Sequence, residues 1–393
     1  MSEKTLILAL ETSCDDTSVS ILKTLKGNKA GFTCLSNIIS SQTEIHRKWG
    51  GVYPTLAKRE HQRNLVPVLT QALKESGLLK KSAKKQTSVA KFKVIEKILE
   101  REPVLFKQLK TFLLKYKKPN VDFIATTEGP GLEPALWVGV NFARALSYFW
   151  NLKITPVNHI EAHLFANFID KDFNLKPDAL FPAISLIVSG GHTQILLMKN
   201  YGKYKILGET RDDAAGECFD KSARILGLGY PGGPAIAKKA SQFKSFPPGA
   251  ELKINLPRPM IHTKDYDLSF SGLKTAVLYN FKSQSAKTRK SKEYITEISK
   301  DIQNAIIEVL ITKTLRAADE YNAKSIILGG GVAANEELRK QFRLKTGAHL
   351  LIPPKILCTD NAAMIGAAGY FHWLKKETKS WKNLSAKANL RIT

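Results

Sequence analysis

Residues 5–22 read TLILALETSCDDTSVSIL, and this stretch decides the fold that we expect. An apolar run ends at Glu11, small and acidic residues follow from Cys14 to Thr17, and alternating apolar residues then resume. This order predicts two strands joined by a polar turn. Residues 183–198, AISLIVSGGHTQILLM, show the same order of strand, turn and strand, with the turn at Ser189 to Thr193. Two such hairpins predict two lobes that each begin in the same way.

Strand and helix patterns alternate after each hairpin. Helical segments are expected at about 55–75, 137–150 and 292–320, and buried strands in VDFIATTEGPGL (121–132) and SIILGG (325–330). Glycines cluster at what we interpret as strand ends: Gly190-Gly191, Gly232-Gly233 and Gly329-Gly330-Gly331. Glycine turns let backbone N–H groups approach phosphate oxygens. The pattern therefore predicts a two-lobe α/β protein that binds a phosphate-bearing ligand in the cleft between its lobes.

Length and composition exclude several classes of protein. The chain has 393 residues, of which 43% are hydrophobic, enough for two cores. Its longest apolar runs, such as FPAISLIV (181–188), fall short of the ~20 residues of a membrane helix, so we expect no membrane span. The four cysteines show no C-x-x-C spacing, which favours a reducing compartment. No Arg-rich presequence is visible at the N-terminus.

The charge is strongly positive and unevenly distributed. The formal net charge is +25 and the pI is about 9.7. Residues 80–118 hold 13 Lys or Arg against three Glu, with apolar residues at helical spacing, so we expect two amphipathic helices interrupted near Pro103. Further basic positions lie at 282–292 and at Lys375, Lys376, Lys379, Lys382 and Lys387. A solvated surface explains any one of these runs, but together they favour nucleic acid as a partner.

Residues 157–168, VNHIEAHLFANF, place His159 and His163 four apart. On a helix this spacing puts two side chains within about 40° of one face, whereas Glu161 points about 200° away. In the zincin pattern H-E-x-x-H the glutamate directly follows the first histidine, but here that position is Ile160. A protease would therefore lack its base. A metal site needs a third ligand from elsewhere, and two ordinary helix histidines remain the alternative.

Nine segments in succession resemble the motifs of one family. They are GGVYPTLAKREH (50–61), TTEGPGLEPALWVG (126–139), NHIEAH (158–163), VSGGHTQI (188–195), GECFDKSAR (216–224), YPGGP (230–234), LSFSGLKTA (268–276), GGGVAAN (329–335) and TDNAAMIG (359–366). The chain thus resembles the TsaD family of tRNA threonylcarbamoyladenosine transferases from about residue 6 to 370, apart from 80–118 and 282–292. The resemblance implies an actin-like, sugar-kinase-like two-lobe (ASKHA) fold. We expect an N-terminal lobe at 1–178, a C-terminal lobe at 179–358, and a segment 359–393 that packs back on the first.

The resemblance also implies site residues. His159, His163 and Asp360 would hold one divalent metal ion per subunit, zinc or iron. The adenylate and threonylcarbamoyl pocket would be lined by Val188, Ser189, Gly190, Gly191, His192, Asp220, Gly233 and Asn335. Structural roles compete at two of these positions, because Asp220 could be a helix cap and Asn335 an N-cap. His192 and Asp15 are candidates for a general base, with nothing to choose between them.

The implied reaction transfers a threonylcarbamoyl group from threonylcarbamoyl-AMP, delivered by a YrdC-type synthase, to the exocyclic amine of the adenosine 3′ of the tRNA anticodon. Three alternatives stay open: a metal-dependent peptidase, an ATP-dependent small-molecule kinase of the same fold class, and a non-catalytic scaffold. The basic insertion, the high pI and the histidine in SGGHT favour the bacterial and mitochondrial branch. We therefore expect the mitochondrial matrix, with the cytoplasm as alternative, and a possible homodimer.

Overall fold

The computed structural model describes residues 4–24, 31–82, 89–170, 177–243 and 254–392. Its contacts divide the chain into two compact units. The first contains Met1–His46, Val52–Lys176 and Asp360–Ile392, and the second contains Arg47–Gly51 and Pro177–Thr359, with Thr393. The first unit is therefore discontinuous, and its last segment comes from the far end of the sequence.

The first unit is built on a five-stranded sheet with the order β3-β2-β1-β4-β5. β1 pairs with β2 and β2 with β3 in antiparallel fashion, whereas β1 with β4 and β4 with β5 are parallel. The strands are β1 (Leu6–Glu11), β2 (Asp16–Thr24), β3 (Phe32–Ser41), β4 (Phe123–Gly129) and β5 (Lys153–Asn158). The predicted hairpin in residues 5–22 is confirmed.

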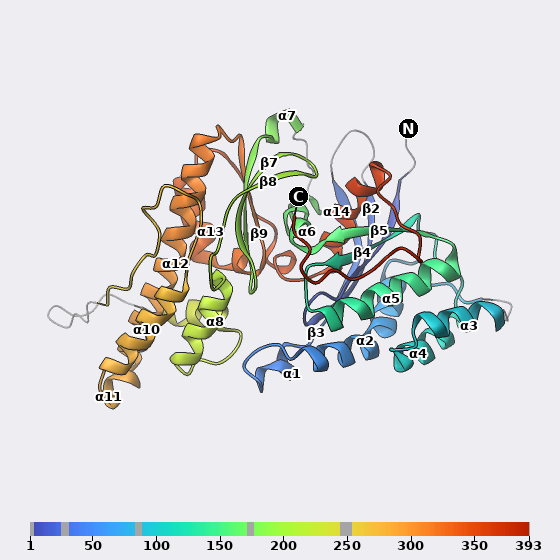
Figure 1. Cartoon of the computed structure of the whole chain (residues 1–393), viewed down its shortest axis with the longest axis horizontal. Helices are drawn as coiled ribbons and strands as arrows, with labels where there is room; N and C mark the ends of the chain where they lie inside the picture. The colour runs from blue at the N-terminus through green and yellow to red at the C-terminus, as the bar shows by residue number, and fades with distance from the viewer. Residues whose placement is uncertain (1–3, 25–30, 83–88, 171–176, 244–253, 393) are drawn as a thin grey trace. The chain divides into compact units, whose positions relative to one another are not determined.

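Helices cover both faces of this sheet (Figure 1). On one face Leu8 and Leu10 of β1 share a core with α2 (Pro54–Glu75), α3 (Val89–Ile98), α4 (Pro103–Lys115) and α5 (Glu133–Trp150). On the other face α14 (Ala362–Leu374) packs so closely that a Cβ on Gly366 would lie 3.1 Å from Ala9 Cβ. Burial on both sides explains why β1 reads as a continuous apolar run. Short segments complete the unit: α1 (Thr43–Arg47), α6 (His159–Phe165) and the 3₁₀ turn η1 (Ala166–Phe168).

The second unit repeats the same strand topology. Its sheet has the order β10-β9-β6-β7-β8. Read from the β8 edge, the strands are the third, second, first, fourth and fifth of this unit in chain order, which is also the order in the first unit. The antiparallel β6–β7–β8 meander and the parallel neighbours β9 and β10 match their counterparts in the first unit. These strands are β6 (Ala183–Val188), β7 (Thr193–Asn200), β8 (Lys203–Glu209), β9 (Ser325–Gly329) and β10 (His349–Leu351). The repeat agrees with the predicted actin-like, sugar-kinase-like class of α/β fold.

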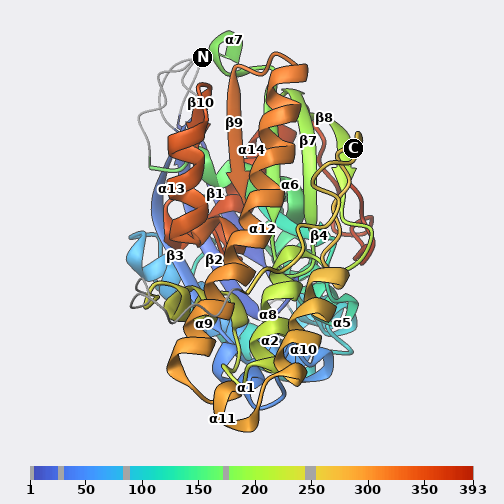
Figure 2. The ribbon, with the colours of Figure 1, turned by 90° about the vertical axis from the view of Figure 1, so that its left-hand side faces the viewer.

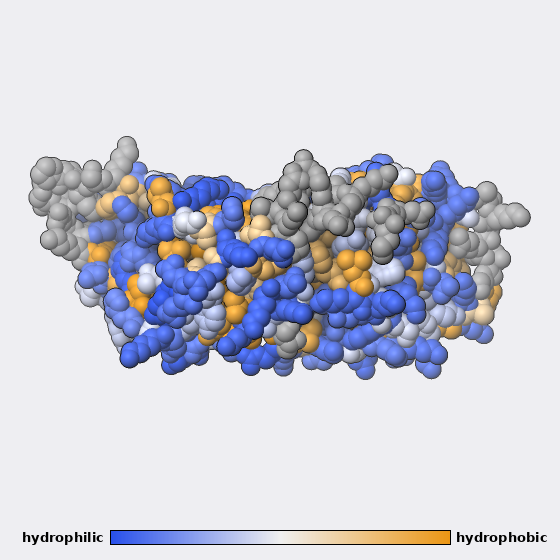
Figure 3. Space-filling model, turned by 90° about the horizontal axis from the view of Figure 1, so that it is seen from above, coloured by the Kyte–Doolittle hydropathy of each residue, from blue (hydrophilic) through white to orange (hydrophobic). Residues whose placement is uncertain are grey.

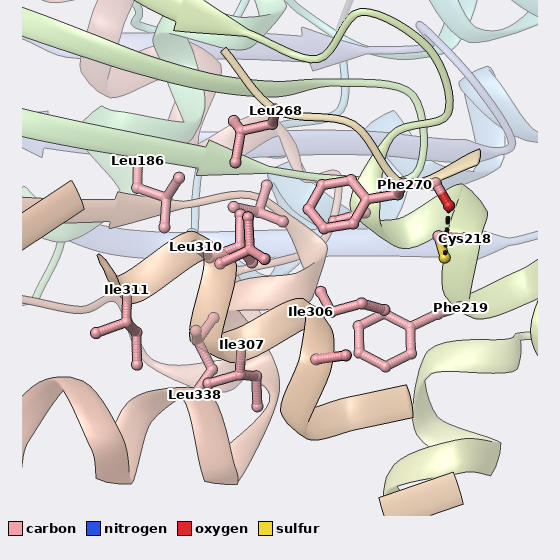
Figure 4. Close-up of a cluster of buried hydrophobic side chains, with 14 of the residues drawn as sticks. Leu186, Cys218, Phe219, Leu268, Phe270, Ile306, Ile307, Leu310, Ile311 and Leu338 are labelled. Carbon is pink, nitrogen blue, oxygen red and sulfur yellow. Dashed lines mark hydrogen bonds between the residues drawn. The ribbon is translucent and has the colours of Figure 1, made fainter. Parts of the chain in front are cut away.

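One long helix organises the core of the second unit (Figure 2). α12 (Lys292–Glu320) has its N-terminus capped by Ser291, whose Oγ accepts from the Tyr294 N–H at 3.2 Å. Its Ile306 and Leu310 lie among side chains from α8 and β6, as Figure 4 shows. In the same cluster the Cys218 thiol donates to the Phe270 carbonyl at 3.6 Å. The remaining helices are α7 (Pro177–Leu180), α8 (Ala215–Ile225), α9 (Gly232–Ala240), α10 (Ser271–Ser283), α11 (Ala286–Arg289) and α13 (Glu336–Lys345), with η2 (Gly331–Ala334) and η3 (Lys355–Leu357).

Helices lie on both sides of Pro103 and on both sides of the Gly232-Gly233 pair. The predicted helices near Pro103 are confirmed as α3 and α4. Lys84 and Lys85, two basic residues of the predicted segment 80–118, lie outside the described residues.

The Gly232-Gly233 pair was expected at a strand end, and this is wrong: the pair follows helix α8 and opens helix α9. Glycine and proline mark a chain reversal without distinguishing which kind of element precedes it.

The surface of the molecule is predominantly hydrophilic on the face that Figure 3 shows, with small scattered apolar patches. Among the described residues, none of the helices combines the length and the apolar character needed to cross a membrane. Large apolar side chains that remain exposed are few, and they include Trp49 and Tyr279. This composition of the surface is compatible with the high net charge of the chain.

Candidate metal and adenylate sites

The two histidines lie on one short helix, α6, which begins at His159. Asn158 caps α6, because its Oδ1 accepts from the N–H groups of Ile160 at 2.9 Å and Glu161 at 3.2 Å. This cap fixes the helix start at His159, so that His163 follows one turn later on the same face. Both rings are buried, and their centroids lie 4.8 Å apart at an interplanar angle of 79°.

Asp360 brings the third side chain to this pair. Its Oδ1 lies 3.4 Å from Nε2 of His159 and 3.4 Å from Nε2 of His163. One ligand atom from each of the three residues lies within 4.8 Å of the others. The position of Asp360 is set by the start of α14, where the Ala362 N–H donates to Ser18 Oγ of β2 at 2.9 Å. The two imidazoles and the carboxylate predicted as metal ligands are therefore neighbours within the first unit.

The orientation of the rings fits a divalent ion. Neither ring nitrogen of His163 makes a hydrogen bond within the described residues, although the side chain is only 1% exposed. A buried imidazole without hydrogen bonds is costly unless another partner binds its lone pair. Two imidazole nitrogens and one carboxylate oxygen suit zinc or iron and leave coordination positions for a substrate. The residues present thus fit the implied metal.

Glu11 was not anticipated as a part of this site. Its carboxylate is fully buried at the end of β1, and its Oε2 lies 3.0 Å from Nδ1 of His159. The same carboxylate accepts from Thr127 Oγ1 at 2.7 Å and from the Ser13 N–H. A carboxylate on the distal nitrogen of a ligand histidine fixes its tautomer and ring orientation. The one signal in the sequence was an acidic residue at the end of an otherwise apolar strand.

Opposing charges shift the pKa values in this cluster. Burial lowers the pKa of His159, but the carboxylates of Asp360 and Glu11 outweigh it and raise that pKa well above its usual value. Burial raises the pKa of Glu11, but His159 outweighs burial and the net shift is downward. For His163, burial dominates and lowers the pKa, which favours the neutral ring that a metal ion requires.

Glu161 faces away from the two histidines, as the helical spacing predicted. Its Oε2 lies 2.7 Å from Nε2 of His372 on α14, and His372 Nδ1 lies 2.5 Å from Glu377 Oε2. Burial lowers the pKa of His372, but its two carboxylate neighbours more than compensate and raise the pKa to about 9. This contact joins α6 to α14, the helix that follows the third ligand. Sequence spacing could not reveal it, because the two residues are 211 positions apart.

The predicted adenylate residues lie in the second unit. Ser189 to His192 form the turn between β6 and β7, in which the His192 N–H donates to Ser189 Oγ at 3.1 Å. Gly216 packs under this turn, where a Cβ would lie 2.5 Å from the Ser189 carbonyl oxygen. A Cβ on Gly190 or Gly191, by contrast, would meet no atom of the described residues within 4 Å. The backbone at these two glycines is therefore open on the side where a side chain would stand, as close approach by a phosphate requires.

Val188 and Gly330 meet at the ends of adjacent strands. The Val188 side chain is 1% exposed and belongs to the hydrophobic core, so only its backbone is available to a ligand. Gly330 has φ +91°, and a Cβ there would lie 2.4 Å from the Val188 carbonyl oxygen. Both the left-handed backbone and the close contact require glycine at this position.

Asp220 and Asn335 have structural roles of their own. Asp220 Oδ1 accepts from the Gly232 N–H at 2.6 Å and so fixes the start of α9; burial raises its pKa. Asn335 is the N-cap of α13: its Oδ1 accepts from the Leu338 N–H at 3.1 Å, and its Nδ2 donates to Gln303 Oε1 at 2.9 Å. Gly233 is less constrained, since among the described residues a Cβ there would meet only Phe219 Cβ, at 4.0 Å.

The two candidates for a general base belong to different units. Asp15 lies in the first unit with the metal cluster, and burial together with the charge of Asp360 raises its pKa. His192 is half-buried in the glycine turn of the second unit. Asp16 was not predicted, but burial and the charge of Asp360 raise its pKa to about 7. The first unit thus presents acidic side chains next to the metal cluster.

Comparisons with known proteins identify the family of this chain. The sequence model described as TsaD, tRNA N6-adenosine threonylcarbamoyltransferase, matches residues 33–85 and 102–367. Proteins of that name from three bacteria are similar over nearly their whole length. The Thermosipho africanus protein is 43% identical (98% of this chain, 100% of that protein), the Bacillus subtilis protein 41% (92% and 89%) and the Thermomicrobium roseum protein 40% (93% and 91%). Similarity of this extent establishes the family, and the chain belongs to the TsaD family of tRNA N6-adenosine threonylcarbamoyltransferases.

Proposed function

We propose that this enzyme transfers a threonylcarbamoyl group to the exocyclic N6 amine of an adenosine in tRNA. The observation that carries the proposal is the cluster of the buried His159 and His163 with the half-buried Asp360, found in a chain that belongs to this family of transferases. The finer specificity, the adenosine 3′ of the anticodon, follows from the family resemblance. The donor would be threonylcarbamoyl-AMP, made by a separate YrdC-type synthase.

The metal cluster would hold one divalent ion, zinc or iron. Such an ion supplies Lewis-acid polarisation of a carbonyl oxygen, here that of the carbamoyl group. Glu11 would accept a hydrogen bond from Nδ1 of His159, so that Nε2 would be the ligand atom of that ring. The buried ring of His163 would supply a second nitrogen ligand. Asp360 contributes the negative charge that a site with two neutral imidazoles otherwise lacks.

The glycine turn would bind the adenylate. The open backbone at Gly190 and Gly191 suits the phosphate of the leaving AMP, since no atom of the described residues lies within 4 Å of the Cβ positions there. Gly233 is likewise open, at the start of helix α9, where N–H groups favour an anion. Asp220 and Asn335 would act mainly by holding the starts of α9 and α13, in view of the hydrogen bonds that they already make.

Two alternative activities receive less support. A zincin-type peptidase needs a glutamate directly after its first ligand histidine as the base, but the residue after His159 is Ile160, and Glu161 bonds to His372 instead. A small-molecule kinase of the same fold class needs no cluster of two buried histidines and an aspartate. Neither activity accounts for the family relationship.

A reconstituted reaction tests the proposal. The purified protein, a YrdC-type synthase, threonine, bicarbonate, ATP and a tRNA transcript are incubated, and nucleosides are analysed by mass spectrometry. Threonylcarbamoyladenosine should appear only with the intact enzyme and not with His159→Ala. Cleavage of casein by the wild type, abolished by the same substitution, without formation of the modified nucleoside would favour the peptidase instead.

Cellular location and assembly are separate proposals. The high pI and the basic insertion support the mitochondrial matrix, whereas the three similar proteins are bacterial, so the cytoplasm is the alternative. Fractionation of cells that express the protein distinguishes the two. A homodimer would give a sedimentation mass of twice 43.7 kDa in the absence of partner proteins.

A further inference from the structure

Residues 89–118, which we name the basic hairpin, present a surface with a strong excess of positive charge. They comprise α3, α4 and the segment that follows α4. Glu96 and Glu100 are the exposed acidic residues of this segment, and the third, Glu102, is buried and accepts from Asn141 Nδ2 at 3.2 Å. Nine basic residues are exposed: Lys91, Lys93, Lys97, Arg101, Lys107, Lys110, Lys115, Lys117 and Lys118.

The apolar faces of both helices are already occupied. Phe92 and Ile95 of α3, and Leu109 and Phe112 of α4, belong to the core of the first unit. The Phe92 ring also packs against Phe149 of α5, with centroids 5.5 Å apart. Helices that bind a membrane surface need an apolar face free to enter the lipid. Within residues 89–118, all of which the structure describes, the only exposed large apolar side chains are Val89 and Val104, so such a face is missing.

Three lysines of the basic hairpin keep charges that no described residue neutralises. Within the described residues, Lys93, Lys97 and Lys107 make no ion pair and no side-chain hydrogen bond. Lys110 lies above aromatic rings at 5.9 Å, an interaction that leaves its charge in place. Clustered like charges repel one another and raise the local concentration of an anionic ligand. Neutralisation by a polyanion would remove this repulsion.

The position of α3 in the sequence separates it from the common part of the family. The family's sequence model matches residues 33–85 and resumes at 102, so it does not include α3. The three predicted metal ligands and all the predicted adenylate residues lie in matched segments. The exposed lysines of α3 and α4 are not among those residues. Their charges can therefore be changed while the predicted ligands stay intact, which allows the basic hairpin to be tested separately.

We propose that the basic hairpin binds the phosphate backbone of the tRNA substrate and raises the affinity of this enzyme for tRNA. The inference rests on the proposed function for the identity of the polyanion. Lysine ammonium groups that contact phosphates release condensed counterions, so the logarithm of the affinity falls linearly with the logarithm of salt concentration. Such contacts carry no sequence information, so they would act on every tRNA alike.

Two variants of equal net charge test the proposal. The first changes Lys93, Lys97 and Lys107 to Gln, and the control changes Lys199, Lys203 and Lys205 to Gln, three exposed lysines on β7 and β8. Each loses three positive charges, so any effect of net charge alone is the same in both. Binding of a tRNA transcript is measured from about 50 to 200 mM salt, a range over which phosphate contacts lose most of their affinity.

The hairpin variant should have a shallower salt slope than the control, by about 0.7–0.9 for each phosphate that it no longer neutralises. If two or three phosphates are no longer neutralised, the drop in tRNA affinity across the salt range should be about 10- to 30-fold smaller than in the control. In the transfer reaction the KM for tRNA should rise, while kcat at saturating tRNA and the affinity for an adenylate analogue stay unchanged. Thermal unfolding of both variants checks that they are folded.

Equal slopes in the two variants would overturn the proposal, even if the wild type modifies tRNA. Loss of binding to phosphatidylserine vesicles without loss of tRNA binding would also overturn it, in favour of a membrane partner. If the wild type made no threonylcarbamoyladenosine but the slopes still differed, the proposed function would fail while the polyanion surface stood. The two proposals are therefore separable.

Discussion

Glu11 Oε2 lies 3.0 Å from His159 Nδ1, and this contact directs the other nitrogen of the ring toward Asp360. The carboxylate accepts a hydrogen bond from Nδ1 of the neutral ring, so Nε2 then carries the lone pair that a metal ion needs. Three protein groups surround Glu11, because Thr127 and the Ser13 N–H also donate to it. The strand β1 thus contributes to the proposed metal site through a side chain that is not itself one of the predicted ligands.

Glu11→Gln should weaken metal binding by about 10- to 100-fold, since an amide removes the negative charge behind His159 while it keeps the shape of the side chain. The affinity is measured by competition with a chromophoric chelator. Ser13→Ala is the control: its Oγ lies 3.1 Å from the same nitrogen but is neutral. We expect a smaller loss there. Equal losses in the two variants would mean that the charge of Glu11 does not matter.

His159→Ala, His163→Ala and Asp360→Ala should each lower bound metal and abolish transfer while the protein stays folded. Each substitution removes one of the three side chains whose ligand atoms meet. Elemental analysis gives the metal content, and circular dichroism gives the fold. Glu161→Gln lies on the same helix but faces His372, so it should keep its metal. Full metal content in all three alanine variants would disprove the site.

His372 should stabilise the fold in a way that depends on pH. Its pKa is raised to about 9 in the folded protein, against about 6.5 in an unfolded chain. The contribution is therefore complete below about pH 6.5, shrinks as pH rises, and is lost above about pH 9. We expect wild type to exceed His372→Gln by about 2–3 kcal/mol at pH 6 and by little at pH 9.5. The free energy of unfolding of both proteins is measured in urea at the two pH values. A difference between wild type and variant that is the same at pH 6 and pH 9.5 would contradict the prediction.

Gly232 and Gly233 should respond differently to alanine. A Cβ on Gly232 would lie 2.5 Å from Asp220 Cα, so Gly232→Ala should cost about 1–3 kcal/mol of the free energy of unfolding. Gly233→Ala should change stability by less than about 1 kcal/mol, because within the described part of the chain its Cβ meets only Phe219 Cβ, at 4.0 Å. Affinity for an adenylate analogue should nevertheless fall in Gly233→Ala. Unchanged affinity there would remove Gly233 from the proposed pocket.

The main elements of the fold could be predicted from sequence because burial leaves a pattern. The two hairpins, the long helix Lys292–Glu320 and the paired helices on either side of Pro103 all follow from the spacing of apolar residues. The start of α9 could not be predicted in the same way. Gly232-Gly233 lies between two helices, and only the close approach of Gly232 to Asp220 shows why a glycine is required there.

The site could be predicted only in part for a similar reason. Helical spacing placed His159 and His163 on one face, but nothing in the spacing identified Asp360, which came from the family resemblance. Glu11 and His372 were missed because each acts across a large sequence separation, 148 residues for Glu11 with His159 and 211 for His372 with Glu161. Such pairings depend on the packing of the sheet and of α14, which periodicity does not describe.

The return of Asp360–Ile392 to the first unit has a consequence for the order of biosynthesis. A nascent chain has made both histidines and the whole sheet of the first unit long before the ribosome reaches residue 360. Until then one face of that sheet lacks α14, and the two imidazoles lack their carboxylate. The second unit, by contrast, is almost continuous in sequence and can fold as it emerges. The proposed metal loading would thereby be confined to chains whose translation is nearly complete.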